Sequence, residues 1–227
     1  VKFAISYIII SVLVIFLSKY LGYFDKPNDR GTHSAPTINT GGLILYLFFL
    51  SVISQGEFNH NIELIVSIGF FVCLAGFIDD RINLSPSSKI FLISIPSFYL
   101  ILNGISISNL GNYEIIGFLE LGKFEIPFLL LAIGLLINAT NYIDGIDGLL
   151  IIFFISCLTY YILLIEDTQT VRLLKIFIFA SIINLILNLL PSGSKLKIFS
   201  GDAGSLFIGF FVSFLTIELY NNFNVHP

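Results

Sequence analysis

The chain has little charge and lacks several residue types that soluble domains usually contain. Its 227 residues include no tryptophan, no methionine and only two cysteines, and only 11% of them are charged. Soluble domains carry about 25% charged residues, so we exclude a soluble globular protein and expect no nucleic-acid partner. Cys73 and Cys157 both lie within apolar stretches, where a thiol usually packs as a small apolar side chain. We therefore expect neither a disulfide nor a redox centre.

Long apolar runs dominate what the chain does contain. Hydrophobic residues make up 56% of it, and its mean hydropathy is +0.95. A transmembrane helix needs about 20 mostly apolar residues. Eight runs approach this length: 3–22, 41–54, 62–78, 89–103, 127–142, 148–165, 170–190 and 204–220. We predict an all-α integral membrane protein, a single polytopic domain over 1–227 with about eight transmembrane helices. Segment 104–126 alternates weakly and contains four glycines, which favours a small non-cytoplasmic β-hairpin.

Acidic residues are sorted between the two sides that these runs define. Seven of the eight aspartates fall in or beside the loops 23–40, 79–88, 143–147 and 191–203, whereas all seven glutamates fall in or beside the other loops. Seven basic residues lie on or near the aspartate side and four on the other, so the positive-inside rule favours the aspartate side as cytoplasmic. Carboxylates gathered where nucleotides and Mg²⁺ are available indicate metal-assisted chemistry on a charged substrate.

The first loop on the aspartate side mixes cations, a histidine and turn residues. It contains Arg30 and His33 and ends in Gly41-Gly42, which open the next apolar run. Two glycines at a helix start would let backbone N–H groups approach a ligand closely. A solvated loop with positive-inside charges explains the same residues equally well.

The second motif is the pair Asp79-Asp80 at the end of the third run. Adjacent carboxylates repel one another, so keeping both ionised is costly unless a cation is close. Mg²⁺, which prefers oxygen ligands, would relieve the repulsion. The alternative is a helix end wetted by the cytoplasm, with Arg81 as its counter-charge.

The third motif places polar residues at every third position, in the order Asn138, Asn141, Asp144 and Asp147. This spacing puts neighbours on adjacent sectors of a helical face. Hydrogen bonds between helices and an Asp-Gly turn would explain part of the pattern. They explain poorly why four polar groups share one register, so we favour a site here.

The fourth motif lies at the start of the last run and reads Lys195-Leu-Lys197-Ile-Phe199-Ser-Gly201-Asp202-Ala-Gly204-Ser205. A helix N-terminus suits an anion, Asp202 suits a metal ion, and Lys197 adds a charge that attracts phosphate. Alternatively, Asp202 is only the N-cap of the helix.

Together the four motifs resemble those of the polyprenyl-phosphate N-acetylhexosamine-1-phosphate transferases. The resemblance covers roughly residues 3–220 and rests on Asp25-Lys-Pro…His33…Pro36…Gly41-Gly42, Asp79-Asp80-Arg81, Asn138-x-x-Asn141-x-x-Asp144-Gly-Ile-Asp147-Gly-Leu149 and Phe199-x-Gly201-Asp202-x-Gly204-Ser205. The third motif is more similar to the GlcNAc-1-phosphate branch than to the phospho-N-acetylmuramoyl-pentapeptide branch.

The resemblance implies a Mg²⁺-dependent phosphoglycosyl transferase of the bacterial inner (plasma) membrane, with its active site facing the cytoplasm. The phosphate of undecaprenyl phosphate would attack the β-phosphorus of a UDP-N-acetylhexosamine, with UDP-GlcNAc as the expected donor, and UMP would leave. This would be the first membrane step of a cell-envelope polysaccharide such as the lipopolysaccharide O-antigen, and so part of cell wall biogenesis.

The resemblance also assigns roles to residues. It implies Asp202 and Asn141 as ligands of Mg²⁺, or alternatively Mn²⁺, and Asp79, Asp80 and Asp144 as catalytic residues. A phosphate monoester with a second pKa near 6 is already mostly dianionic, so we expect Asp79 and Asp80 to orient the lipid phosphate rather than deprotonate it. The implied substrate-binding residues are Asp147, Phe199, Asn138, Gly41, Gly42, Arg30, His33 and Lys197.

The chain departs from this family at its end. Members usually continue through more spans to a cytoplasmic loop rich in Arg and His, whereas this chain ends at Pro227. We therefore expect it to be C-terminally incomplete. Two alternatives stay open: a phospho-N-acetylmuramoyl-pentapeptide transferase, and an ion-coupled transporter, whose carboxylates would lie nearer the bilayer midplane. Neither the sugar nor a homodimeric state is fixed by the sequence.

Overall fold

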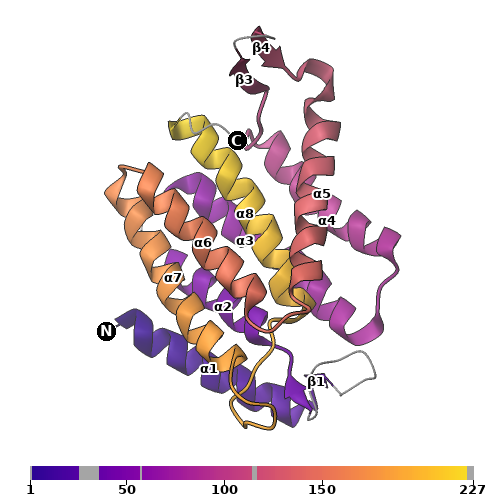
Figure 1. Ribbon diagram of the computed structural model, residues 1–227, viewed down its shortest axis with the longest axis vertical. Coiled ribbons are helices and arrows are strands. Elements are labelled where there is room, and N and C mark those ends of the chain that lie inside the picture. The colour runs from indigo at the N-terminus through magenta and orange to yellow at the C-terminus, as the bar shows by residue number, and fades with distance from the viewer. Residues whose placement is uncertain (1, 26–35, 57, 114–116, 224–227) are drawn as a thin grey trace.

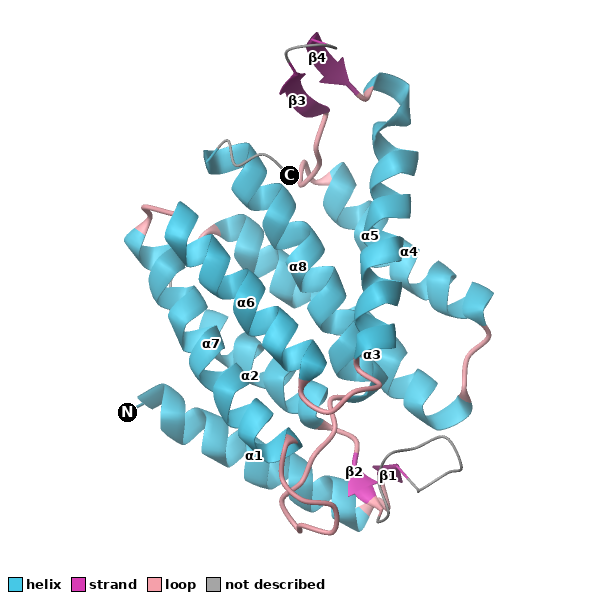
Figure 2. Ribbon diagram, in the orientation of Figure 1, coloured by secondary structure: helices cyan, strands magenta, loops and turns pink. Residues whose placement is uncertain are grey.

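A computed structural model describes residues 2–25, 36–56, 58–113 and 117–223. It is mostly helical (Figures 1 and 2). The described elements are, in chain order, α1 (Lys2–Tyr20), β1 (Phe24–Asp25), β2 (Thr37–Ile38), α2 (Gly41–Ile53), α3 (His60–Ile82), α4 (Pro86–Leu102), β3 (Asn109–Tyr113), β4 (Gly117–Glu120), the short 3₁₀ helix η1 (Gly122–Phe124), α5 (Glu125–Ile143), α6 (Leu149–Leu164), α7 (Thr168–Asn188) and α8 (Gly201–Phe223).

Each of the eight predicted apolar runs forms one α-helix. Within the described residues, five helices are long and apolar enough to cross a membrane: α1, α3, α5 with its preceding η1, α7 and α8. The others, α2, α4 and α6, have 13, 17 and 16 residues and are shorter than a usual span. The prediction of an all-α membrane protein is thus confirmed for the helices, while eight full spans stay a prediction.

Helix α8 forms the core of the bundle. It packs against α2, α3, α5 and α6, and it crosses the middle of the molecule in Figure 1. In the most apolar part of α8, 89% of the residues are buried inside the protein, against 22% in that of α1. One face of α1 is therefore left for lipid. Aromatic rings fill the space between α8 and its neighbours: Phe49 of α2 stacks on Phe177 of α7, with ring centroids 3.7 Å apart, and both rings also contact Phe211 of α8.

Side chains that accept backbone hydrogen bonds mark where several helices begin. The Asn59 side chain accepts a bond from Asn61 N before α3, and Ser85 accepts one from Ser88 N before α4. Asp167 does the same for the first turn of α7, through bonds from Gln169 N and Thr170 N. These are the residue types that stabilise helix N-termini best, which explains why the apolar runs start as helices at these positions.

The two small sheets lie at opposite ends of the bundle (Figure 1). Strands β3 and β4 pair antiparallel, so the hairpin predicted within 104–126 is confirmed. Strands β1 and β2 pair at the other end, where Ile38 of β2 also bridges Ile198 in the segment before α8. This bridge brings the first loop beside the loop 189–200.

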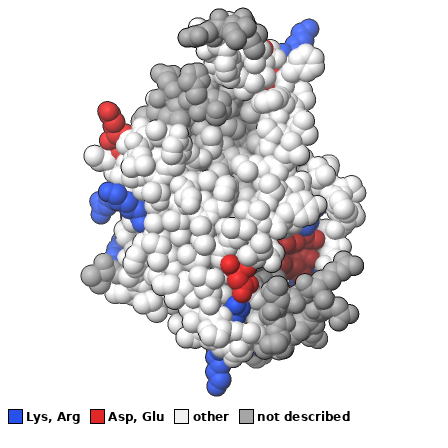
Figure 3. Space-filling view, in the orientation of Figure 1, with Lys and Arg blue, Asp and Glu red and all other residues white. Residues whose placement is uncertain are grey.

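The predicted aspartate-side loops meet at the end that carries β1 and β2. We call this the aspartate end; it comprises the C-terminus of α3, the turn between α5 and α6, and the N-terminus of α8. Figure 3 shows acidic side chains gathered low on the right of the visible face, below a mostly uncharged middle region. The hairpin β3–β4 and the turn between α6 and α7 lie at the opposite end.

Candidate active site at the aspartate end

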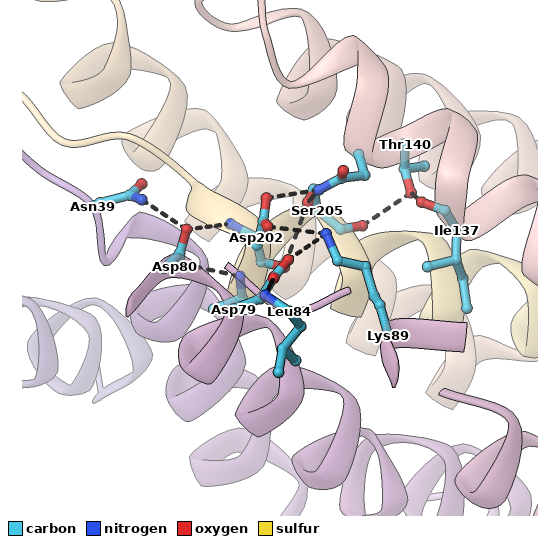
Figure 4. Close-up of polar contacts among 11 residues, drawn as sticks. Asn39, Asp79, Asp80, Leu84, Lys89, Ile137, Thr140, Asp202 and Ser205 are labelled. Atoms are coloured by element: carbon cyan, nitrogen blue, oxygen red, sulfur yellow. Dashed lines mark hydrogen bonds and ion pairs between the residues drawn. The ribbon is translucent and has the colours of Figure 1, made fainter. Parts of the chain in front are cut away.

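Asp80 caps the N-terminus of α8 from a different helix. Its Oδ1 accepts hydrogen bonds from Asp202 N at 3.1 Å and from Asn39 Nδ2 at 2.9 Å, and its Oδ2 accepts one from Ala203 N at 3.5 Å (Figure 4). A carboxylate at a helix N-terminus satisfies free N–H groups and complements the helix dipole. Asp80 therefore fixes where α8 begins and, through it, the position of Asp202.

Glycines allow the helices around this point to approach very closely. A Cβ on Gly42 of α2 would lie 2.0 Å from the Cα of Gly204, and a Cβ on Gly76 of α3 would lie 2.3 Å from the Asp202 carbonyl oxygen. Any larger residue would force the helices apart, which is how small residues set helix packing in membranes. The glycines thus hold the N-terminus of α8 against both α2 and α3.

Asp202 lies at the centre of a polar cluster contributed by four helices. Its Oδ1 accepts a hydrogen bond from Asn141 Nδ2 of α5 at 2.7 Å, and Asn141 also donates to Ser205 Oγ at 2.9 Å. Its Oδ2 is 3.2 Å from Lys89 Nζ of α4, and the same ammonium group forms an ion pair with Asp79 of α3 (Figure 4). Lys89 thus bridges two carboxylates from different helices.

Asp79 differs from its neighbour in being closed off from solvent. Only 4% of it is exposed, and its Oδ1 accepts a hydrogen bond from Leu84 N at 2.7 Å. The adjacent carboxylates thus have different partners: Asp79 turns toward Lys89 and the loop after α3, while Asp80 turns toward α8. The two adjacent carboxylates are thus held by contacts from different parts of the chain.

Asp144 adds a further carboxyl group to the cluster, and it has no basic partner among the described residues. Burial raises its pKa well above the usual range, and the carboxylates of Asp202, Asp80 and Asp147 raise it further. Desolvation and like charges both disfavour the ionised form of a carboxyl group. The aspartate end therefore holds more carboxylates than Lys89 can neutralise.

Asp147 and Lys197 form a second ion pair at this end. Lys197 is buried, and its Nζ donates to Asp147 Oδ2 at 2.7 Å and to Leu190 O at 2.9 Å. The same ammonium group lies 5.2 Å from the centroid of the half-buried Phe199 ring, a cation–π contact. The predicted phosphate-binding lysine is thus engaged with a carboxylate and joins the turn after α5 to the segment before α8.

The donor set suits Mg²⁺ chemically, although the described residues are not arranged as a finished metal site. Among them, no group of three or more His, Cys, Asp or Glu side chains is placed to hold a metal ion. Carboxylate and amide oxygens are nevertheless the ligands Mg²⁺ prefers, and Lys89 already places a positive charge between Asp79 and Asp202. Asn141 turns its nitrogen toward Asp202, so acting as a ligand would require its amide to rotate and present the oxygen.

Several predicted site residues lie elsewhere or are occupied. The N–H groups of Gly41 and Gly42 donate to the carbonyl oxygens of Phe199 and Ser200 at 2.7 and 2.9 Å, so they are not free for a ligand as the sequence suggested. Asn138 donates to Gly134 O within α5 and lines a small pocket between α4 and α5, apart from the cluster. Arg30 and His33 lie outside the described residues.

Three residues join the site that sequence reasoning did not place there. In the sequence, Lys89 was assigned only to the basic residues of the cytoplasmic side. Its position four residues after Ser85, where α4 begins, could have indicated a residue of the site. Asn39 had no signal of its own beyond its place before Gly41. Asn184 of α7 is buried in an apolar run and donates to Gly41 O at 2.8 Å, and an amide in such a run indicates a buried partner.

Several apolar helices around a polar cluster at one end of the bundle define a multi-pass membrane protein with a site near its surface. The family model of glycosyl transferase family 4 matches residues 62–220, which include α5, most of α3 and α8, and every aspartate of the cluster. The chain belongs to this family.

Curated relatives agree with this assignment. The chain is 31% identical over 217 residues to the "undecaprenyl-phosphate alpha-N-acetylglucosaminyl 1-phosphate transferase" of Yersinia pestis, covering 91% of this chain and 58% of that protein. It is 33% identical to the protein of the same name from Escherichia coli, covering 98% and 63%. A "probable undecaprenyl-phosphate N-acetylglucosaminyl 1-phosphate transferase" of Bacillus subtilis is 28% identical, with 94% and 60% covered. The chain thus spans about three fifths of the length of these relatives.

Proposed function

We propose that the protein transfers an N-acetylhexosamine 1-phosphate, with GlcNAc as the expected sugar, from its UDP-sugar to undecaprenyl phosphate and releases UMP. The observation that carries the proposal is the convergence of Asp79, Lys89, Asn141 and Asp202 from four helices at one end of the bundle. The family assignment and the names of the relatives support the same reaction.

The reaction brings two anionic phosphates together, so positive charge is required at the site. Asp202 and Asn141 would hold Mg²⁺, with Mn²⁺ as an alternative ion. When bound, the ion supplies charge neutralisation for the diphosphate and its leaving group. The excess of carboxylates over Lys89 at the aspartate end supports this requirement, because buried carboxylates that lack a cation repel one another.

Lys89 and Asp79 would position the acceptor phosphate. Lys89 Nζ lies 3.2 Å from Asp202 Oδ2, and its contact with Asp79 fixes where the ammonium group points. The acceptor phosphate is already mostly dianionic at neutral pH, so the attack needs orientation more than a general base. Asp80 would act indirectly, because its carboxylate is engaged by the N-terminus of α8 and by Asn39.

The nucleotide would be bound beside this cluster. The half-buried Phe199 ring would stack on the uracil base, while Asp147 is exposed enough to accept hydrogen bonds from the base or from the ribose. Asp144 interacts electrostatically with Asp202 and with Asp147, and it would contact the sugar or support the metal ligands. The basic bias of this end supports a cytoplasmic orientation, as expected for a protein that uses a UDP-sugar.

UMP release tests the proposal directly. Membranes containing the protein should release UMP when supplied with UDP-GlcNAc, a polyprenyl phosphate and Mg²⁺, and each omission should abolish the release. Asp202→Ala should abolish it as well. Release that does not require the polyprenyl phosphate, or that is unaffected by Asp202→Ala, would exclude this mechanism.

A further inference from the structure

Two basic side chains lie within the membrane-crossing length of α7, far from the aspartate end. Arg172 and Lys175 are the fifth and eighth residues of this helix, and both are exposed on its surface. At a rise of about 1.5 Å per residue, Lys175 lies about 10 Å along the helix from its start. Charges at this depth are costly and are normally paired with an anion or extended toward the interface.

Among the described residues, no acidic side chain is paired with these two basic residues. Neither Arg172 nor Lys175 forms an ion pair or a side-chain hydrogen bond there. The nearby Asp167 carboxylate is engaged in capping α7, where it accepts bonds from Gln169 N and Thr170 N. The positive-inside rule does not account for them either, because it concentrates basic residues at the opposite end of the bundle.

Arg172 and Lys175 also separate two hollows on the surface of the bundle. The hollow on the α1 side has a volume of about 330 Å³, and its apolar lining includes Phe3, Ile176 and Phe179. The hollow on the α6 side has a volume of about 500 Å³, with Ile162 and Val171 in its lining. Both basic residues line both hollows, so one anionic group bound between them would have apolar side chains on each side, with Glu166 and Thr168 also in the lining on the α6 side.

We propose that Arg172 and Lys175 bind the headgroup phosphate of an anionic phospholipid, whose two acyl chains occupy the two hollows. A guanidinium group matches the geometry of a phosphate, and a lysine can extend its ammonium group to the same height in the membrane. A diacyl lipid fits this arrangement better than a soluble anion does, because the hollow on the α1 side is almost entirely apolar and the hollow on the α6 side adds Ile162, Ile165 and Val171 beside its polar residues. The site is separate from the proposed transferase chemistry and lies in the leaflet that faces away from the aspartate end.

Glu166 provides an internal check on the proposal. It lines the hollow on the α6 side together with the two basic residues, where its carboxylate would repel a phosphate. Replacing it with a neutral residue of the same shape should therefore tighten binding of an anionic lipid and leave binding of a zwitterionic lipid unchanged.

Lipid binding can be measured on the detergent-solubilised protein by native mass spectrometry and by thermal unfolding with added lipid. Phosphatidylglycerol should bind and raise the unfolding temperature, whereas phosphatidylcholine with the same acyl chains should not. Arg172→Gln with Lys175→Gln should weaken phosphatidylglycerol binding at least tenfold, and Glu166→Gln should strengthen it. Lys123→Gln serves as the matched control, because Lys123 is an exposed basic residue near the same end and lines neither hollow.

The proposal fails if phosphatidylglycerol binds the double variant as tightly as the wild type, or if both lipids stabilise the protein equally. It also fails if the double variant changes only the oligomeric state, because a second copy of the chain would then be the occupant. UMP release by the double variant at saturating substrate should stay close to that of the wild type, which separates failure of this proposal from failure of the transferase function.

Discussion

Helix α8 carries one carboxylate near each end, and the surroundings of the two differ. Near its C-terminal end, Glu218 is only 2% exposed, and both of its oxygens accept hydrogen bonds from amides, Asn61 Nδ2 at 2.8 Å and Asn222 Nδ2 at 2.5 Å. In the first turn of α8, Asp202 contacts Lys89 and Asn141, but the carboxyl groups of other aspartates lie close to it.

The difference distinguishes a structural carboxylate from a candidate catalytic one. Neutral donors complete the hydrogen bonding of Glu218, so it needs nothing from outside the protein. The group of Asp79, Asp80, Asp144 and Asp202 has one bridging lysine and therefore more carboxyl groups than positive charges. Buried charges without partners are costly, and proteins keep such arrangements mainly at functional sites.

Removing the charge at each end of α8 should give the largest contrast. We expect Asp202→Asn to lower the rate of UMP release by about 10²–10³-fold, because a group that stabilises the reacting charges is lost. Glu218→Gln, at the other end of the same helix, should release UMP at close to the wild-type rate. Equal losses of UMP release in the two variants would mean that the activity depends no more on the aspartate end of α8 than on its other end.

Glycine substitutions test the packing that positions α8. Gly42→Ala should destabilise the protein by about 1–3 kcal/mol, because its Cβ would overlap Gly204. Gly134→Ala in α5 is the matched control: a Cβ there meets no other atom within 4 Å, so alanine should leave the stability unchanged or raise it by up to about 1 kcal/mol. Chemical denaturation in detergent would compare the two. A stable Gly42→Ala variant would contradict the close approach of α2 and α8.

The capping role of Asp80 can be separated from direct catalysis with a second capping residue. Asp80→Ala should cost about 1–2 kcal/mol of stability and also reduce UMP release, because the N-terminus of α8 carries Asp202. Asp167→Ala removes the cap of α7 at the opposite end and should cost a similar stability without affecting UMP release. Asp80→Asn, which keeps one acceptor oxygen, should recover part of both losses. Full activity of Asp80→Ala would show that α8 does not need this cap.

A smaller effect is expected from pH, through Asp144. Its pKa is raised in the folded protein, so the folded state binds this proton more tightly than the unfolded state does. The resulting stability is fully present below the unfolded pKa of about 3.9 and is lost as pH rises through the folded pKa. The Asp144→Asn variant has no carboxyl group that titrates at this position, so its stability does not contain this pH-dependent contribution. The unfolding temperature of the variant relative to the wild type, in EDTA, should therefore increase as pH rises from about 4. A pH-independent difference would contradict the assigned shift.

Much of the fold could be read from the sequence because local patterns determine it. The eight apolar runs form the eight helices, and the glycine-rich segment after α4 forms the hairpin β3–β4. The assignment of aspartates and glutamates to opposite ends of the bundle also follows from the alternation of successive loops between the two sides. Whether a helix spans the membrane could not be decided in this way, because α2, α4 and α6 are too short to meet the criterion by themselves.

The site was predictable only in outline because its contacts join residues far apart in the chain. The motifs identified Asp202 and Asn141, which do meet. They gave no sign that Asp80 caps α8, a contact across 122 positions, or that Lys89 reaches Asp202 across 113. Spacing also grouped Asn138 with Asn141, although the structure turns Asn138 toward α4. Periodicity defines the face of a helix but not which neighbour covers it.

Binding of Mn²⁺, followed by electron paramagnetic resonance on the purified protein, tests the central claim most directly. The claim is that the carboxylate surplus at the start of α8 is completed by a divalent cation. The wild type and Glu218→Gln should bind Mn²⁺ in competition with Mg²⁺, and Asp202→Asn should lose this binding. Lys89→Gln should bind more tightly, because the competing ammonium group is gone. Equal binding by the wild type and Asp202→Asn would contradict the claim.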